Sequence, residues 1–170
     1  PVMVCVGAVS TDAILHLADD AQAAGANALL LPAVSYQPLR DEEVFSLFET
    51  VTRHVSVPVC IYDNPGTTHF TFTDELHGRL SSLEGIRSVK IPGVPDSPAA
   101  AIERVNALRQ HLRPGVTIGI SGDAYAGLGL NAGCEVWYSV CGGLFPEMAK
   151  QITEAAAAND RQRVTALTTR

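Results

Sequence analysis

The chain has 170 residues, 46% of them hydrophobic and 18% charged, which suits one domain built on a sheet buried on both faces. Its net charge of −6 argues against a nucleic-acid binder, which would carry a basic face. No apolar run reaches membrane-spanning length, and the first residues lack a charged segment followed by an apolar one. We therefore expect a cytoplasmic protein with no nucleic-acid and no membrane partner.

Short apolar runs alternate with amphipathic segments along the whole chain. The apolar runs predict strands at 2–6, 28–31, 57–62, 86–91, 116–120 and 136–140. The segments between and after them predict helices at 11–24, 41–54, 74–83, 97–112, 124–132, 146–158 and 161–169. Ser10 and Thr73 supply N-caps, and Gly25 ends the first helix. Strand and helix thus follow one another regularly.

This alternation predicts an α/β fold with right-handed βαβ units and a parallel sheet. Two architectures fit: an open doubly wound sheet, or a stretch of a (β/α)₈ TIM barrel. No Gly-x-Gly-x-x-Gly and no Gly-rich Lys-Ser/Thr loop follows a strand, so the nucleotide-binding form of the open sheet lacks its phosphate cradle. As a barrel, residues 1–170 form a single partial domain with about six of eight βα units, the other two lying upstream of Pro1.

Cysteines and histidines carry little functional signal. Cys5, Cys60, Cys134 and Cys141 lie far apart or inside apolar runs, without metal-ligand spacing, so we expect reduced core thiols and no metal. The histidines on predicted helices or helix ends are expected at the surface: His16, His54, His77 and His111.

Lys90 is the most informative residue, because ten of the twelve basic residues are arginine. The other lysine, Lys150, lies on a solvated helix face. Lys90 ends a strand that Pro92 and Gly93 terminate, and burial there favours a neutral, nucleophilic amine of the kind that forms a Schiff base. The alternative is a lysine whose ammonium extends to water and does no chemistry.

Tyr62 ends the preceding strand. In parallel α/β folds the active site lies at the carboxyl ends of the strands, so the two side chains are expected at the same mouth. A phenol can relay protons as a lysine adduct of a ketone loses water. The alternative is a core aromatic whose hydroxyl reaches a loop carbonyl. Ser121-Gly-Asp123 and residues 139–143 follow the last two strands in the same way.

Four segments in the right order resemble one known family. Ile-Tyr-Asp-Asn-Pro-Gly-Thr-Thr at 61–68 resembles the Tyr-Asn-x-Pro-x-x-Thr segment of the dihydrodipicolinate synthase / N-acetylneuraminate lyase family. Ser88-Val-Lys90 is similar to its Gly-Ile-Lys Schiff-base segment, at a matching interval. Ser121-Gly-Asp123 resembles its Ser-Gly-Asp, and residues 132–139 resemble its Gly-Gly-x-Gly-x-Ile-Ser stretch.

The resemblance implies a (β/α)₈ barrel that works without metal or cofactor and performs class I aldolase chemistry on pyruvate and an aldehyde. Lys90 would form the Schiff base, Tyr62 would relay protons, and Asp123 would be structural or line the mouth. The substrate-binding residues would be Asn64, Thr67, Thr68, Trp137 and Tyr36. Tyr36 is the only candidate for the tyrosine that the family lends across a tight dimer, so a homodimer or homotetramer is expected.

Some positions depart from the family pattern. The Gly-x-x-Gly-Glu and Thr-Thr segments that help bind the pyruvate carboxylate are absent, so this chain alone is expected to be inactive. Thr67 stands where dihydrodipicolinate synthases carry an arginine for the second substrate's carboxylate, and a neutral hydroxyl cannot replace a guanidinium. This favours a lyase or aldolase for another 2-oxo acid. Ile91 after the lysine predicts a more apolar pocket.

Two other functions remain open. The same imine could serve a sugar-acid dehydratase or aldolase of this family. The chain could also belong to a binding or regulatory homologue that has lost catalysis, although the retained Tyr62 and Lys90 argue against it.

Overall fold

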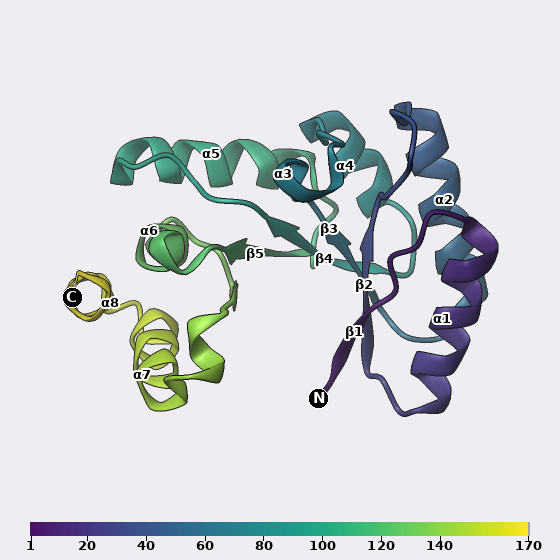
Figure 1. Cartoon of the computed structure of the whole chain (residues 1–170). Helices are drawn as coiled ribbons and strands as arrows, with labels where there is room; N and C mark the ends of the chain where they lie inside the picture. Colours follow the sequence, from purple (N-terminus) through teal and green to yellow (C-terminus); the bar gives the residue numbers. More distant parts are fainter. Residues whose placement is uncertain (170) are drawn as a thin grey trace. The chain divides into compact units, whose positions relative to one another are not determined.

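The computed structural model describes residues 1–169, which group into two compact units (Figure 1). The first unit comprises Pro1–Val89 with His111–Val116, and the second comprises Lys90–Gln110 with the described residues from Thr117 onward. That all 170 residues form one domain stays a prediction.

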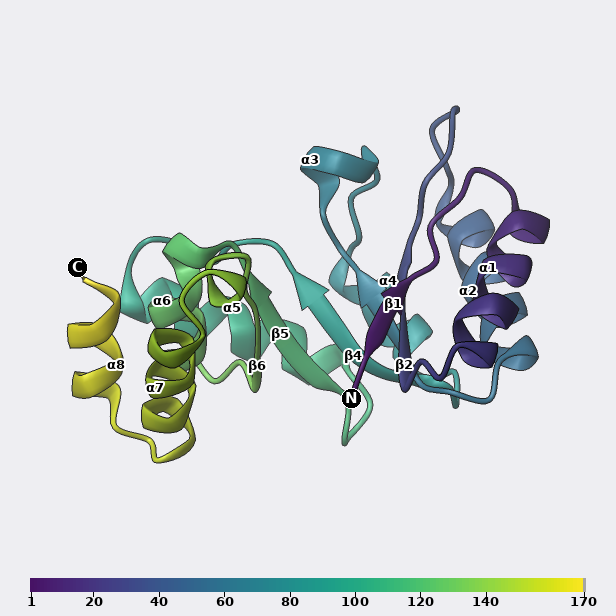
Figure 2. The same ribbon diagram turned by 60° about the horizontal axis from the view of Figure 1, so that its bottom comes forward.

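The first unit is built on parallel strands with helices between them. Its elements are β1 (Met3–Cys5), α1 (Thr11–Ala23), β2 (Ala28–Pro32), α2 (Asp41–His54), β3 (Val59–Tyr62), α3 (Pro65–Thr68), α4 (Asp74–Ser81) and the start of β4 (Ile86–Ile91). Cys5 pairs with Leu30, and Pro32 with Tyr62. Val59, Cys60 and Ile61 are buried in succession, as expected for a strand covered on both faces. Helices α1 and α2 run side by side along this sheet (Figures 1 and 2).

The second unit starts at the end of β4. It contains α5 (Pro98–His111), β5 (Thr117–Ser121), η1 (Asp123–Tyr125), α6 (Ala126–Asn131), β6 (Val136–Tyr138), η2 (Cys141–Gly143), α7 (Pro146–Ala157) and α8 (Arg161–Thr168). β5 and β6 pair in parallel, with Gly119 opposite Val136. A Cβ on Gly119 would lie 2.3 Å from the Tyr138 ring, so this position needs a glycine. Helices α7 and α8 lie against each other (Figure 2).

Strand order follows chain order, β1 to β6, in the part of the chain that the structure describes. A doubly wound sheet reverses its strand order at a switch point, whereas a (β/α)₈ barrel does not. The barrel class, with six of its strands present, is therefore confirmed.

The predicted strands and helices are all present, with differences at their ends. β3 begins at Val59 rather than residue 57, because Pro58 has no N–H to donate to the ladder. The short helix α3 was not predicted. It begins with Pro65 and ends at His69, whose backbone adopts the left-handed conformation with φ of 58°. Within residues 1–169 no helix is both long and apolar enough to cross a membrane.

Candidate active-site residues and family

Lys90 lies at the carboxyl end of β4, in the second unit. Its neighbours Val89 and Ile91 are buried, and Lys90 itself is half-buried. The Nζ atom lies 5.3 Å from the centroid of the Tyr138 ring, which β6 supplies. The face of an aromatic ring attracts the ammonium form of a lysine. Lys150, by contrast, is 74% exposed and 3.6 Å from Glu154, as a solvated helix face predicts.

Tyr62 is the last residue of β3, in the first unit, and is half-buried. The Asn64 Nδ2 atom donates to the phenolic oxygen at 3.0 Å. The hydroxyl that we expect to relay protons is therefore held by a neutral amide two residues further along the chain. A meeting of Tyr62 with Lys90 at one mouth stays a prediction.

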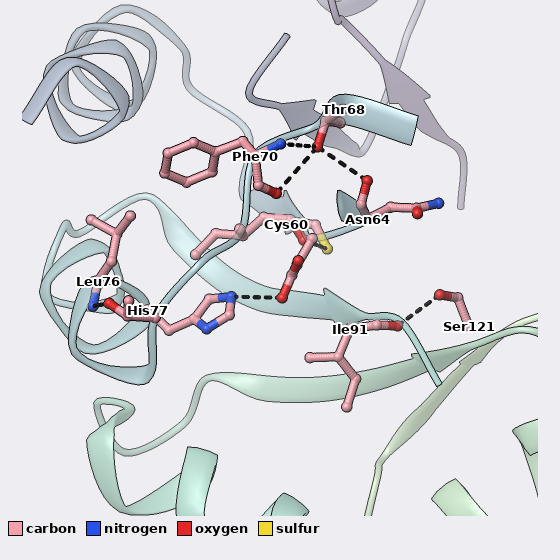
Figure 3. A network of polar contacts seen from close by, with 11 residues as sticks. Cys60, Asn64, Thr68, Phe70, Leu76, His77, Ile91 and Ser121 are labelled. Atoms are coloured by element: carbon pink, nitrogen blue, oxygen red, sulfur yellow. Dashed lines mark hydrogen bonds and ion pairs between the residues drawn. The ribbon is translucent and has the colours of Figure 1, made fainter. Parts of the chain in front are cut away.

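The segment after Tyr62 contains three of the predicted substrate-binding residues. Thr68 is buried, and its hydroxyl donates to the Asn64 carbonyl at 3.0 Å while accepting from the Phe70 N–H at 3.4 Å (Figure 3). Thr68 thus closes the turn of α3. Thr67 is exposed, so its hydroxyl is available to a ligand. Substrate contacts of all three residues remain predictions.

His77 corrects one sequence prediction. The surface interpretation is wrong, because its side chain is fully buried and its Nε2 atom lies 3.5 Å from Asp63 Oδ2. The ring also stacks on Phe72, with centroids 5.1 Å apart. Leu76 and Leu80 flank His77 on the buried stripe of α4, and this spacing was a signal for burial. The remaining three, His16, His54 and His111, are exposed as predicted.

Asp123 holds the turn after β6 in the second unit. Its Oδ1 atom accepts from the Ser139 hydroxyl at 3.0 Å and the Val140 N–H at 3.1 Å, and its Oδ2 atom accepts from the Cys141 N–H at 2.8 Å. Desolvation acts to raise the pKa of Asp123, but the hydrogen bonds from Cys141, Ser139 and Val140 together outweigh it and lower the pKa. These contacts support the structural role expected for this residue.

Trp137 and Tyr36 differ in their surroundings. Trp137 lies on β6, half-buried, and its indole N–H is buried without a hydrogen-bond partner among residues 1–169. Tyr36 follows β2 and is 94% exposed. With Thr68 and His69 it lines a pocket of about 130 Å³ in the first unit. A role for either residue in substrate binding stays a prediction.

The cysteines are free thiols, but only some lie in the core. Cys60 and Cys134 are buried, which confirms the prediction for them. Cys5 is exposed and Cys141 half-buried, so the prediction is wrong for Cys5, whose side chain points outward from β1. Burial, reinforced by the charge of Glu135 and opposed by Arg109, raises the pKa of Cys134 to about 12. In the described residues, no group of three His, Cys, Asp or Glu side chains could hold a metal ion.

Comparisons with known proteins agree on one family. The chain is 32% identical over 164 residues to a 4-hydroxy-tetrahydrodipicolinate synthase of Bartonella bacilliformis, covering 94% of this chain and 53% of the relative. A solved dihydrodipicolinate synthase from Agrobacterium tumefaciens str. C58 is 41% identical with a TM-score of 0.92, covering 98% of this chain and 56% of that one.

A third comparison concerns the fold alone. The chloride-inhibited dihydrodipicolinate synthase of Acinetobacter baumannii, solved in complex with pyruvate, is 22% identical with a TM-score of 0.86, over 99% of this chain and 56% of that one. The chain spans about half the length of the curated relatives it matches. The model of the Dihydrodipicolinate synthetase family matches residues 1–170. The chain therefore belongs to the dihydrodipicolinate synthetase family.

Proposed function

We propose that the protein is a lyase or synthase that binds pyruvate or a related 2-oxo acid as a Schiff base on Lys90 and joins it to, or cleaves it from, an aldehyde. The observation that carries this proposal is the position of Lys90, half-buried at the end of β4 in a chain that belongs to this family. The protein would act in the cytoplasm as a homodimer or homotetramer, without a cofactor.

The proposed reaction begins with attack of the Lys90 amine on the keto carbon. The C–N bond forms, the carbonyl oxygen takes a proton, and loss of water from the carbinolamine leaves the imine. Loss of a proton from the adjacent carbon gives an enamine, which attacks the aldehyde carbon. Hydrolysis then releases the product and restores the amine. The attack needs the uncharged form of the amine, because an ammonium has no lone pair to give to the keto carbon.

Tyr62 would carry protons to and from the carbinolamine oxygen. The phenol can donate and accept, and the amide of Asn64 supports the phenolic oxygen at 3.0 Å. This role rests on the match of residues 61–68 to the family segment.

The substrate class is a 2-oxo acid, with pyruvate as the simplest member. A solved member of the family holds pyruvate. Thr67 is neutral and exposed where an arginine would pair with a second carboxylate, so the aldehyde partner is not expected to need such a pair. The same position favours, as a second candidate, a sugar-acid dehydratase, because a hydroxyl can hydrogen-bond to sugar hydroxyls.

Borohydride trapping of the full-length protein tests the proposal. Reduction in the presence of pyruvate should add one pyruvate-derived mass to the peptide containing Lys90. Lys90→Arg keeps the charge but cannot form the imine, so it should abolish the adduct and lower turnover on the order of 10⁴-fold. Lys150→Arg, the matched control, should leave both unchanged.

Two results would contradict this. A wild-type protein without adduct at Lys90 removes the imine mechanism. Pyruvate binding that Lys90→Ala leaves unchanged would instead support a homologue that has lost catalysis.

A further inference from the structure

We propose that His77 is a positioning residue for the end of β3, and that it acts through Asp63 to fix the backbone that carries Tyr62. The inference rests on the proposed function, since it concerns the group that would relay protons there. It gives a role to the buried pair of His77 and Asp63, of which the sequence analysis expected His77 at the surface.

The pair is removed from water. The His77 side chain is 0% exposed and the Asp63 side chain 9% exposed, with 3.5 Å between Nε2 and Oδ2. A carboxylate can only accept, so in any hydrogen bond across this 3.5 Å separation Nε2 would be the donor. If the imidazole were lost, the carboxylate would stay buried without this counterpart, which strongly disfavours the native arrangement.

Aromatic packing fixes the direction of the imidazole. Phe72 stacks on the His77 ring with an interplanar angle of 13°. Phe72 is in turn held edge-on by Phe70, at 4.8 Å, and by Phe48, at 6.3 Å between centroids. These contacts fix the plane of the His77 ring, and Nε2 then lies 3.5 Å from Asp63 Oδ2.

A second line of contacts leads back to Tyr62. Asn64 donates to the phenolic oxygen of Tyr62. The Thr68 hydroxyl links the Asn64 carbonyl to the Phe70 N–H (Figure 3). Phe70 then packs against Phe72, the residue that stacks on His77. The contacts form a closed circuit that begins and ends at two successive residues, Tyr62 and Asp63.

Through these contacts His77, on α4, can affect the position of the Tyr62 phenol. Tyr62 is the last residue of β3 and Asp63 follows it directly, so the anchor at Asp63 acts on the backbone that carries the phenol. A displaced Asp63 shifts Tyr62 with it. A shift of about 1 Å in a reacting group can slow a reaction roughly 100-fold.

The test is the rate of imine formation at Lys90 at saturating pyruvate, trapped with borohydride and quantified by mass spectrometry on the full-length protein. His77→Leu, which has no nitrogen, should slow the rate roughly 10- to 100-fold and change the half-saturating pyruvate concentration little. His77→Gln, which can place an N–H near the position of Nε2, should retain most of the rate. This rescue would not follow from a loss of packing alone.

A double-mutant cycle separates positioning from stability. Asp63→Ala should slow the reaction as much as His77→Leu, and the double variant should lose no more than either one. The double variant should nevertheless melt at a higher temperature than His77→Leu, because it does not keep a buried carboxylate that has lost its imidazole. Leu80→Ala, a cavity in the same helix, should lower the melting temperature and leave the rate near wild type.

The inference is overturned if His77→Leu stays within about twofold of the wild-type rate, if the losses at Asp63 and His77 multiply, or if Leu80→Ala slows the reaction equally. Should His77→Leu not fold, Asp63→Ala and His77→Gln decide by the same criteria. Failure of the proposed function is distinct, because the wild-type protein would then form no adduct at Lys90.

Discussion

Two segments that follow strands are held by different means. In the first unit, the segment after β3 is anchored by a buried imidazole and a stack of aromatic rings contributed by residues that follow it in the chain. In the second unit, the segment after β6 is anchored by one half-buried carboxylate, Asp123, which accepts two backbone N–H groups and a hydroxyl. Both aspartates lie just after a strand and both contact a side chain distant in the chain, but Asp63 is buried and Asp123 only half-buried.

Burial determines how much stability is lost when a carboxylate loses its partners. Asp123 is half-buried, so water can take over part of its hydrogen bonding to Ser139, Val140 and Cys141 when the carboxylate is lost. Asp63 is buried, with 9% of its side chain exposed, so the loss of the His77 imidazole has a larger energetic effect. Three measurements test whether the buried Asp63 and the half-buried Asp123 differ in this way.

The largest expected effect is on stability at the buried pair. His77→Leu should lower the free energy of unfolding by about 3–5 kcal/mol, because it leaves a buried carboxylate without its imidazole. His54 offers a matched control, since its Nε2 atom lies 2.8 Å from Asp19 at the surface. His54→Leu should cost about 0–1 kcal/mol. Equal losses for both variants in urea denaturation would abolish the distinction between buried and exposed pairs.

A smaller effect is expected at Asp123. Asp123→Ala removes three accepted hydrogen bonds and should lower the free energy of unfolding by about 1–3 kcal/mol. The amides of Val140 and Cys141 should exchange faster with deuterium. Asp123→Asn keeps one acceptor oxygen and should show an intermediate change. Unchanged exchange at both amides in Asp123→Ala would mean that the carboxylate does not hold this turn.

The smallest effect is a dependence of stability on pH. The pKa of Asp123 is lowered from its ordinary value of 3.8 in the folded chain, so the ionised form is favoured by folding. Its contribution is fully present above pH 3.8 and is lost as the pH falls through the lower, folded pKa. The stability difference between wild type and Asp123→Asn should therefore shrink as the pH falls from neutral to about 2. A difference that grows on acidification would reverse the assigned direction.

Much of the fold was predictable, because its signals are local. The apolar runs at β2, β3 and β4 and the caps Ser10 and Thr73 act over a few residues, and the structure has those elements at the predicted places. The ends of elements were less predictable. α3 depends on Pro65 at its start and on the left-handed conformation of His69 at its end, and β6 is shorter than its apolar run.

The candidate site was predictable at the level of residue type and position. Lys90 and Tyr62 stand out because a lysine and a phenol come at the ends of successive apolar runs. In the structure Tyr62 is the last residue of β3 and Lys90 the last but one of β4. The contacts that hold them were not predictable. Tyr138 lies beside Lys90 only because β5 and β6 pair in a register that Gly119 permits.

Sequence patterns alone predicted the order of strands and helices and the side chains near the strand ends, because hydrophobic periodicity and turn chemistry are short-range. The barrel, in contrast to an open sheet, was predicted only from the resemblance to a known family. Other features became visible only with the tertiary structure. His77 is buried against Asp63, Thr68 closes its own turn and Cys5 is exposed. Whether a polar side chain is buried depends on partners from other elements, and no local pattern contains those partners.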